Sequence, residues 1–167
     1  TKTNKKGGVR TDKTFEWKGQ KFYVYEVEKM FNGAVRPDQV LPESPRTVDD
    51  FRILIKDFNE EAPQESIIAT LNDKLDEGTK YLYVIEYYES KSTSEKGVIM
   101  YLEEYDGYTN HANVAGDTDT NPNRLIFAAG EMIWYPENNK LFCNNATGHY
   151  KVKQEDAEKA INTFFNN

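Results

Sequence analysis

Apolar and aromatic residues recur in short stretches of this chain, mostly alternating with polar ones, a period of two that is typical of β-strands. The stretches cover residues 14–17, 21–31, 80–89, 97–105, 125–134 and 140–144. Short polar segments join them in pairs, such as Lys18-Gly19-Gln20 between the first two. The pattern therefore predicts three hairpins, and from them an antiparallel sheet of about six strands.

Three other stretches carry apolar residues at the spacing of an amphipathic helix. The first follows Thr47, a capping residue, the second runs from Pro63 to Gly78, and the third lies within 157–164. Their apolar positions are Phe51, Leu54, Ile55 and Phe58; Ile67, Ile68, Leu71 and Leu75; and Ala157, Ala160, Ile161 and Phe164. Hairpins interrupted by helices predict an α+β fold, with three short helices mainly on one face of the sheet.

Residues 1–13 show no apolar periodicity and contain two adjacent glycines. This segment is basic, and against its single acidic residue it carries Lys2, Lys5, Lys6, Arg10 and Lys13. We therefore expect a flexible basic arm over residues 1–13, followed by one α+β domain over residues 14–167. Because the whole chain has a net charge of -7, that domain is acidic, and the arm suits binding to an acidic protein surface.

Charge and composition also restrict the partners. Tyrosines on paired strands could stack on single-stranded nucleic acid, but these strands also carry acidic residues where phosphate binding needs Lys and Arg. The acidic positions are Glu86, Glu89, Glu103 and Glu104. The sequence therefore disfavours nucleic acid and favours a protein partner or self-association, because tyrosine is a common anchor in protein interfaces.

The sequence also bears on compartment. The longest apolar runs fall far short of the roughly 20 residues that a membrane span needs. Cys143 is the one cysteine, so no internal disulfide can form, which favours a reducing, cytoplasmic location. The triplet Asn145-Ala146-Thr147 fits a glycosylation acceptor, so secretion stays open as an alternative.

The stretch from Leu141 to Val152, LFCNNATGHYKV, holds the strongest candidates for chemistry. His149 follows a glycine at a predicted turn, where it could act as a general acid or base with Glu131 or Tyr150 as helpers. The alternative is that His149 and Tyr150 pack the junction between the sheet and the last helix, with Thr147 bonding locally. Cys143 alternates with an apolar neighbour, which predicts a buried, unreactive thiol.

Residues 127–152 and the helix after them resemble a C-terminal pattern of bacterial polymorphic-toxin and large-DNA-virus-encoded proteins. In that pattern a strand ending in Ala-Gly-Glu and a second strand lead into Asn-x-Ser-Gly-His-Tyr-x-Pro. The matching positions are Gly130, Glu131, Asn145, Thr147, Gly148, His149 and Tyr150. Thr147 replaces the serine and Val152 the proline. The resemblance implies that the chain could be virus-encoded. It implies no particular reaction, because none is settled for proteins with this pattern.

Metal and cofactor signatures are weak. The run from Asp117 to Asn121 begins like a calcium loop, but Pro122 and Ala128 stand where an EF-hand needs Gly and Glu. His111 could join His149 in a metal site, although nothing in the sequence fixes their distance. We expect no cofactor. The favoured interpretation is a non-catalytic interaction or assembly domain, and the alternative is a small enzyme or toxin domain that uses His149.

Overall fold

The structure, a computed structural model, describes residues 8–27, 54–57, 65–89, 96–107, 111–115, 125–147, 150 and 152–165. Its strands are β1 (Gly8–Trp17), β2 (Gln20–Val27), β3 (Leu54–Asp57), β4 (Tyr81–Glu89), β5 (Lys96–Glu104), β6 (Leu125–Tyr135) and β7 (Lys140–Cys143). Its helices are α1 (Glu65–Lys74), α2 (His111–Ala115) and α3 (Gln154–Phe164), with a 3-10 turn η3 (Pro136–Asn138). The predicted α+β class with an antiparallel sheet is confirmed.

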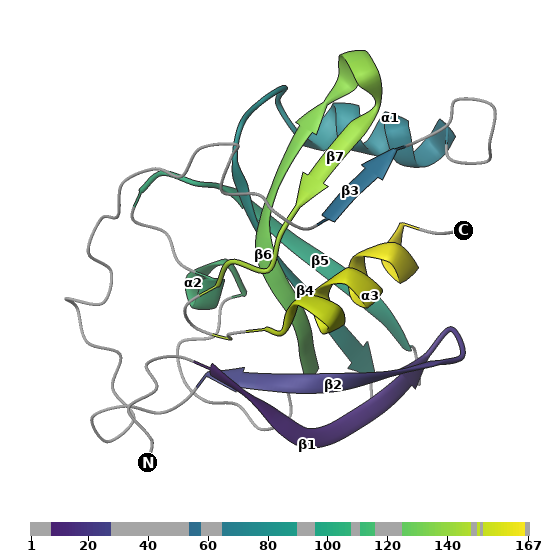
Figure 1. Cartoon of the computed structure of the whole chain (residues 1–167), viewed down its shortest axis with the longest axis vertical. Helices are drawn as coiled ribbons and strands as arrows, with labels where there is room; N and C mark the ends of the chain where they lie inside the picture. The colour runs from purple at the N-terminus through teal and green to yellow at the C-terminus, as the bar shows by residue number, and fades with distance from the viewer. Residues whose placement is uncertain are drawn as a thin grey trace.

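The sheet is organised around β6, as Figure 1 shows. One edge of β6 pairs with β4 from Leu125 to Met132. Its other edge pairs with β2 at Ile126 and with β7 from Met132 onward. The order β1-β2-β6-β4-β5 therefore carries a second branch, in which β3 pairs with β7. We call the stretch of β6 between these two branches the fork.

All six predicted strands are present, and the first hairpin turns where the sequence predicts. Lys18 and Gly19 both have positive φ there, at 51° and 75°, as a two-residue hairpin turn requires. The seventh strand, β3, corrects a prediction: its four residues lie inside the expected first helix but form a ladder with β7. A short apolar run fits either structure, and the pairing offered by β7 decides between them. The rest of that predicted helix lies outside the described residues.

The other two predicted helices form as α1 and α3, while α2 forms outside the stretches with predicted helical spacing. The helices contact different strands of the sheet. Trp134 Nε1 donates to Asn72 Oδ1 of α1 at 2.8 Å, whereas α3 contacts β6 and β2, and α2 contacts β4 and β5 (Figure 1). The helices therefore pack at separate places on the branched sheet, and their placement on one face stays a prediction.

The boundary of the predicted arm also changes. β1 begins at Gly8, and residues 8–10 pair with Val27, Glu26 and Tyr25 of β2. Main-chain pairing requires no apolar side chain, so the missing periodicity did not reveal this strand. Residues 8–13 therefore belong to the sheet and not to a flexible arm; residues 1–7 lie outside the described residues.

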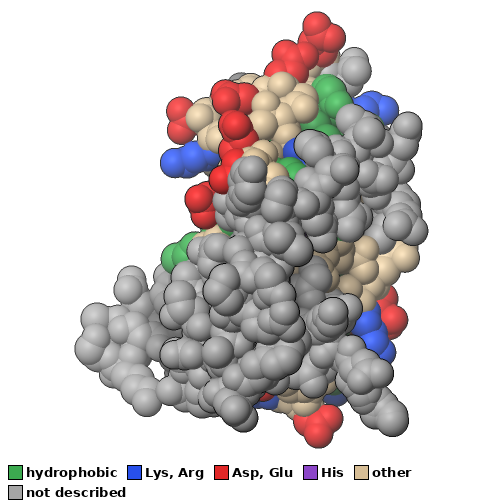
Figure 2. Space-filling model, turned by 90° about the vertical axis from the view of Figure 1, so that its left-hand side faces the viewer, with side chains coloured by type: hydrophobic (Ala, Val, Ile, Leu, Met, Phe, Trp, Pro, Cys, Tyr) green, Lys and Arg blue, Asp and Glu red, His purple; other side chains and the backbone are tan. Residues whose placement is uncertain are grey.

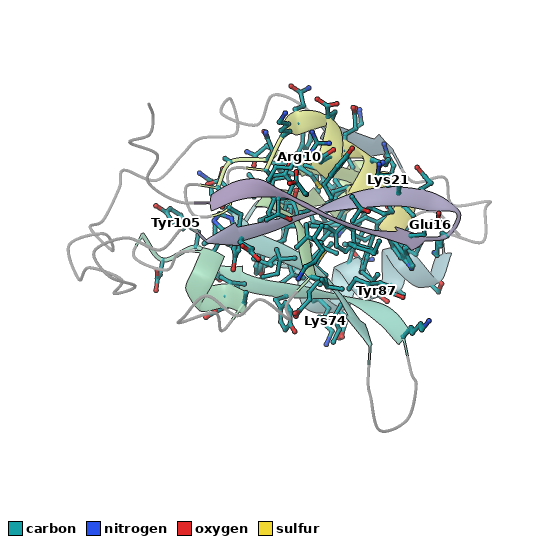
Figure 3. The ribbon with its side chains drawn as sticks, turned by 90° about the horizontal axis from the view of Figure 1, so that it is seen from below. Arg10, Glu16, Lys21, Lys74, Tyr87 and Tyr105 are labelled. Atoms are coloured by element: carbon teal, nitrogen blue, oxygen red, sulfur yellow. The ribbon has the colours of Figure 1, made fainter. Side chains whose placement is uncertain are left out.

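An aromatic cluster joins the β1–β2 hairpin to the central strands. Its members are Phe15, Trp17, Phe22, Tyr87 and Phe127. The ring centroids of Phe15 and Tyr87 lie 4.6 Å apart, and those of Phe22 and Phe127 lie 5.0 Å apart. Figure 3 shows the hairpin crossing in front of the core, with Tyr87 of β4 beside it. These contacts fold the hairpin back over the sheet and bury the apolar area that holds it there.

Candidate functional site

The fork is closed by Asn144, the residue that follows β7. Its main-chain N–H donates to the Glu131 carbonyl at 3.0 Å, continuing the ladder by one residue. Its side-chain Oδ1 accepts from the N–H of Glu131 and from that of Ala146, both at 2.9 Å. Its Nδ2 donates to Glu131 Oε1 at 3.1 Å. The Asn144 side chain thus forms hydrogen bonds with the main chain and carboxylate of Glu131, in the part of β6 that pairs with neither β2 nor β7.

Gly130 lets the chain close over the fork. A Cβ atom at this position would lie 1.9 Å from the carbonyl oxygen of Asn144 and 2.9 Å from a ring carbon of Tyr83. The Tyr83 hydroxyl donates to that same Asn144 oxygen at 2.7 Å. His111 Nε2 lies 2.8 Å from the Gly130 carbonyl oxygen, so this nitrogen carries the proton and donates. We call these residues, together with Glu131, the fork cluster.

The fork cluster is buried, and burial sets its chemistry. Loss of water around Tyr83 raises the pKa of its phenol well above the usual 10.0, and the neighbouring Cys143 and Glu131 raise it further. Burial alone raises the pKa of the Cys143 thiol. Both groups therefore stay protonated and neutral at ordinary pH. The expected burial of Cys143 is confirmed, and a buried thiol with a raised pKa is expected to be unreactive.

The predicted acid–base site is described at two of its three positions. Glu131 is 4% exposed and is bonded to Asn144, while Tyr150 is 0% exposed. His149 lies outside the described residues. The Tyr150 N–H donates to the Thr147 hydroxyl at 3.3 Å, as the packing alternative expects of Thr147. The two described members are therefore integral to the packed junction between the sheet and α3.

The predicted basic binding residues separate into different environments. Arg10 is half-buried and contacts two residues: its Nε lies 3.3 Å from Asp156 Oδ2, and its guanidinium lies 3.5 Å from the centroid of the Tyr23 ring. Tyr25 donates to the same Asp156 oxygen at 2.6 Å. Figure 3 shows Arg10 at the end of the hairpin beside α3. We call these four residues the clasp; in it Arg10 contacts residues of its own chain.

The clasp also changes Tyr25. Burial raises the pKa of its phenol above the usual 10.0, and the hydrogen bond to Asp156 raises it further. The Tyr25 oxygen also accepts the N–H of Lys153 at 3.0 Å, just before α3. Of the remaining basic residues predicted to bind, Lys13 is exposed on β1. Lys2, Lys5 and Lys6 lie outside the described residues.

Asp156, His111 and Asn144 organise these contacts, but the sequence carries no clear signal of that role. Asp156 precedes the predicted helix and lies in the first turn of α3, where acidic residues are common and carry no sign of burial. His111 and Asn144 lie in polar stretches whose partners are distant in sequence. Only Gly130 carried a signal, since it belongs to the Ala-Gly-Glu segment of the resemblance.

The outer strand β5 carries the one large apolar side chain that is exposed among the described residues, Ile99 at 41%. Its neighbours Val98, Met100, Tyr101 and Leu102 are half-buried. Lys96 is exposed at one end of the strand, and Glu103 and Glu104 at the other. Figure 2 shows one face of the molecule, where acidic side chains gather with a few basic ones over the upper described part, beside small hydrophobic areas.

No known family, curated protein or solved structure matches this chain. Among the described residues, no three His, Cys, Asp or Glu side chains come together as metal ligands would. Within the same ranges, every helix is too short or too polar to cross a membrane. The geometry of the molecule is therefore the basis for a functional assignment.

Proposed function

We propose that the chain is a non-catalytic protein-interaction or assembly domain that binds through the outer edge of its sheet at β5. The observation that carries the proposal is the exposure of Ile99, at 41%, in the middle of an outer strand. An outer strand offers unpaired main-chain groups in addition to its side chains, and a partner strand can pair with both.

The state of the predicted catalytic residues supports an interaction domain over an enzyme. A general acid or base must reach the proton that it transfers. Glu131 is 4% exposed with its carboxylate bonded to Asn144, and Tyr150 is fully buried. Both residues lie in the packed region where β7, β6 and α3 meet, so the observed contacts favour a structural role for Glu131 and Tyr150.

Site-specific photo-cross-linking in the cells that make the protein tests this proposal. A photoreactive amino acid at position 99 should give discrete protein adducts, because the side chain lies on the proposed interface. The matched control places the same group at position 69, where Ala69 is exposed on α1. Adducts of equal pattern at both positions, or none at position 99, would contradict an interface at β5.

The enzyme alternative is tested with the same protein. Glu131→Gln keeps the shape of the side chain but removes its charge, so under the interaction proposal the adducts at position 99 should persist if the fold is intact. The enzyme alternative would be favoured by a folded Glu131→Gln protein that retains its adducts at position 99 but no longer produces the phenotype that the unchanged protein causes in cells.

A further inference from the structure

The three outer strands of the described sheet differ in how they are protected against pairing with another chain. Natural outer strands are blunted by charges, by irregular pairing or by being very short. β1 carries Arg10, Asp12, Lys13 and Glu16, and its pairing with β2 shifts register between Arg10 and Thr14. β3 has four residues. Each of these strands therefore has at least one recognised form of protection.

β5 has neither charges nor irregular pairing over its central part and is not short, although α2 contacts it as well as β4. It is nine residues long, its pairing with β4 is regular throughout, and no charged residue lies between Gly97 and Leu102. Among the described residues it is paired by β4 on one side and ends the sheet order on the other. An apolar, regular outer strand of this length is what a strand-to-strand interface requires.

The residue order of β5 identifies the partner. When two copies of KGVIMYLEE run antiparallel with Met100 opposite Met100, the strand is complementary to itself. Lys96 then lies opposite Glu104 of the second copy, Val98 opposite Leu102, and Ile99 opposite Tyr101. A shift of two residues in either direction removes the charge pair and places Lys96 opposite Leu102, or Val98 opposite Glu104.

The paired residues also lie on matching faces. Side chains alternate along a strand, so Lys96, Val98, Met100, Leu102 and Glu104 share one face of β5. In the antiparallel pair that face carries an apolar row with an opposite-charge pair at each end, an arrangement in which every cross-strand neighbour is favourable. The two copies are related by a two-fold axis through the Met100 pair, which closes the assembly as a dimer.

We infer that two copies of this chain dimerise by antiparallel pairing of their β5 strands, centred on Met100, so that their sheets become continuous. This inference rests on the proposed function and deepens it, since it names a second copy as the partner at the β5 edge. Residues of the two strands that lie opposite each other would have Cα atoms about 4.5–5.5 Å apart.

Cysteine cross-linking of the full-length chain tests both the dimer and its register. A Cα separation of about 4.5–5.5 Å lies within the range that disulfides span. Met100→Cys should therefore form a disulfide-linked dimer under mild oxidation. Lys96→Cys and Glu104→Cys should each cross-link poorly alone but efficiently when the two proteins are mixed. The native Cys143 is buried and contributes little background.

Sedimentation velocity over a range of concentrations measures the dimer without cross-linking. Ile99→Lys adds a charge twice to the symmetric interface and should weaken dimerisation at least tenfold, while Ala69→Lys on α1 should leave it unchanged. Ile99→Thr, a milder change that keeps a β-branched side chain, should weaken it less. Circular dichroism confirms that each variant is folded.

The outcomes separate this inference from the proposed function. A dimer that cross-links through Met100→Cys, with the mixed pair at positions 96 and 104, supports the inference. A monomer at all concentrations, or cross-linking that is independent of position, overturns it. If the pure protein is a monomer but position 99 still gives discrete adducts in cells, the interaction function stands with a different partner. If neither is observed, both proposals fail.

Discussion

Gly130→Ala should be one of the most damaging single-methyl changes in this protein. The added Cβ would lie 1.9 Å from the Asn144 carbonyl oxygen and 2.8 Å from its carbonyl carbon. Ordinary contact between such atoms is about 3.5 Å, so the main chain at Asn144 must move by more than about 1 Å. It cannot do so while keeping its N–H on the Glu131 carbonyl and its oxygen on the Tyr83 hydroxyl.

The size of the effect follows from these contacts. Overpacking a well-packed interior costs about 1–3 kcal/mol. Two buried hydrogen bonds contribute about 1 kcal/mol each. We therefore expect Gly130→Ala to lower the free energy of unfolding by about 3–5 kcal/mol, out of the roughly 5–15 kcal/mol of a typical domain.

Urea unfolding followed by tryptophan fluorescence measures this loss. The matched control is Gly19→Ala: Gly19 has a φ of 75° and nothing within 4 Å of its added Cβ, so that change costs about 1 kcal/mol of backbone strain with no steric overlap. If Gly130→Ala proves no more destabilising than Gly19→Ala, the inferred close contact between Gly130 and the Asn144 main chain is wrong.

Further predictions concern the clasp and the buried ionisable groups. Asp156→Ala should destabilise the protein by about 2 kcal/mol in urea unfolding, because the Tyr25 hydroxyl loses its acceptor. Asp156→Asn should cost less, because the amide oxygen can still accept. Equal stability of both variants and the unchanged protein would contradict the clasp. Cys143 should resist thiol reagents in the native protein and react on unfolding, and rapid native labelling would contradict its burial. The pKa values of Tyr25, Tyr83 and Cys143 are raised on folding, so the unfolded chain releases protons that the folded chain keeps. Stability should therefore be complete below about pH 9 and fall as pH rises further, with a shallower fall in Cys143→Ala; a stability that is flat to pH 11 would refute this.

The sequence predicted those parts of the fold that are determined locally. The alternation in residues 80–89 and the glycine turn after Trp17 specify strands and a hairpin through neighbouring residues alone, and the structure has both. The helix predicted after Thr47 failed at 54–57, where pairing with β7, more than eighty residues later, outweighs a helical spacing of apolar residues. Local pattern carries no information about such distant partners.

The same distinction applies to the candidate site. The sequence correctly indicated that Cys143 is buried, since its alternation with Leu141 is local. It assigned Glu131 a chemical role through the Ala-Gly-Glu segment of the resemblance, because the sequence shows no sign of the Asn144 side chain that binds this carboxylate. It assigned Arg10 to a binding arm for a similar reason: the acidic partner lies 146 positions later, in α3.

The clasp has a consequence for synthesis on the ribosome. The β1–β2 hairpin is made early, yet the groups that hold it are among the last described residues to be translated: Tyr25 is bonded to a residue 131 positions later, and Gln20 to one 143 positions later. Until α3 has left the exit tunnel, the nascent hairpin lacks these contacts, and until β6 follows it, Phe15 and Phe22 lack Phe127. Exposed aromatic surface of this kind is prone to aggregate. Growing chains of this protein should therefore depend on chaperones for most of their elongation, and that dependence should end once α3 has emerged.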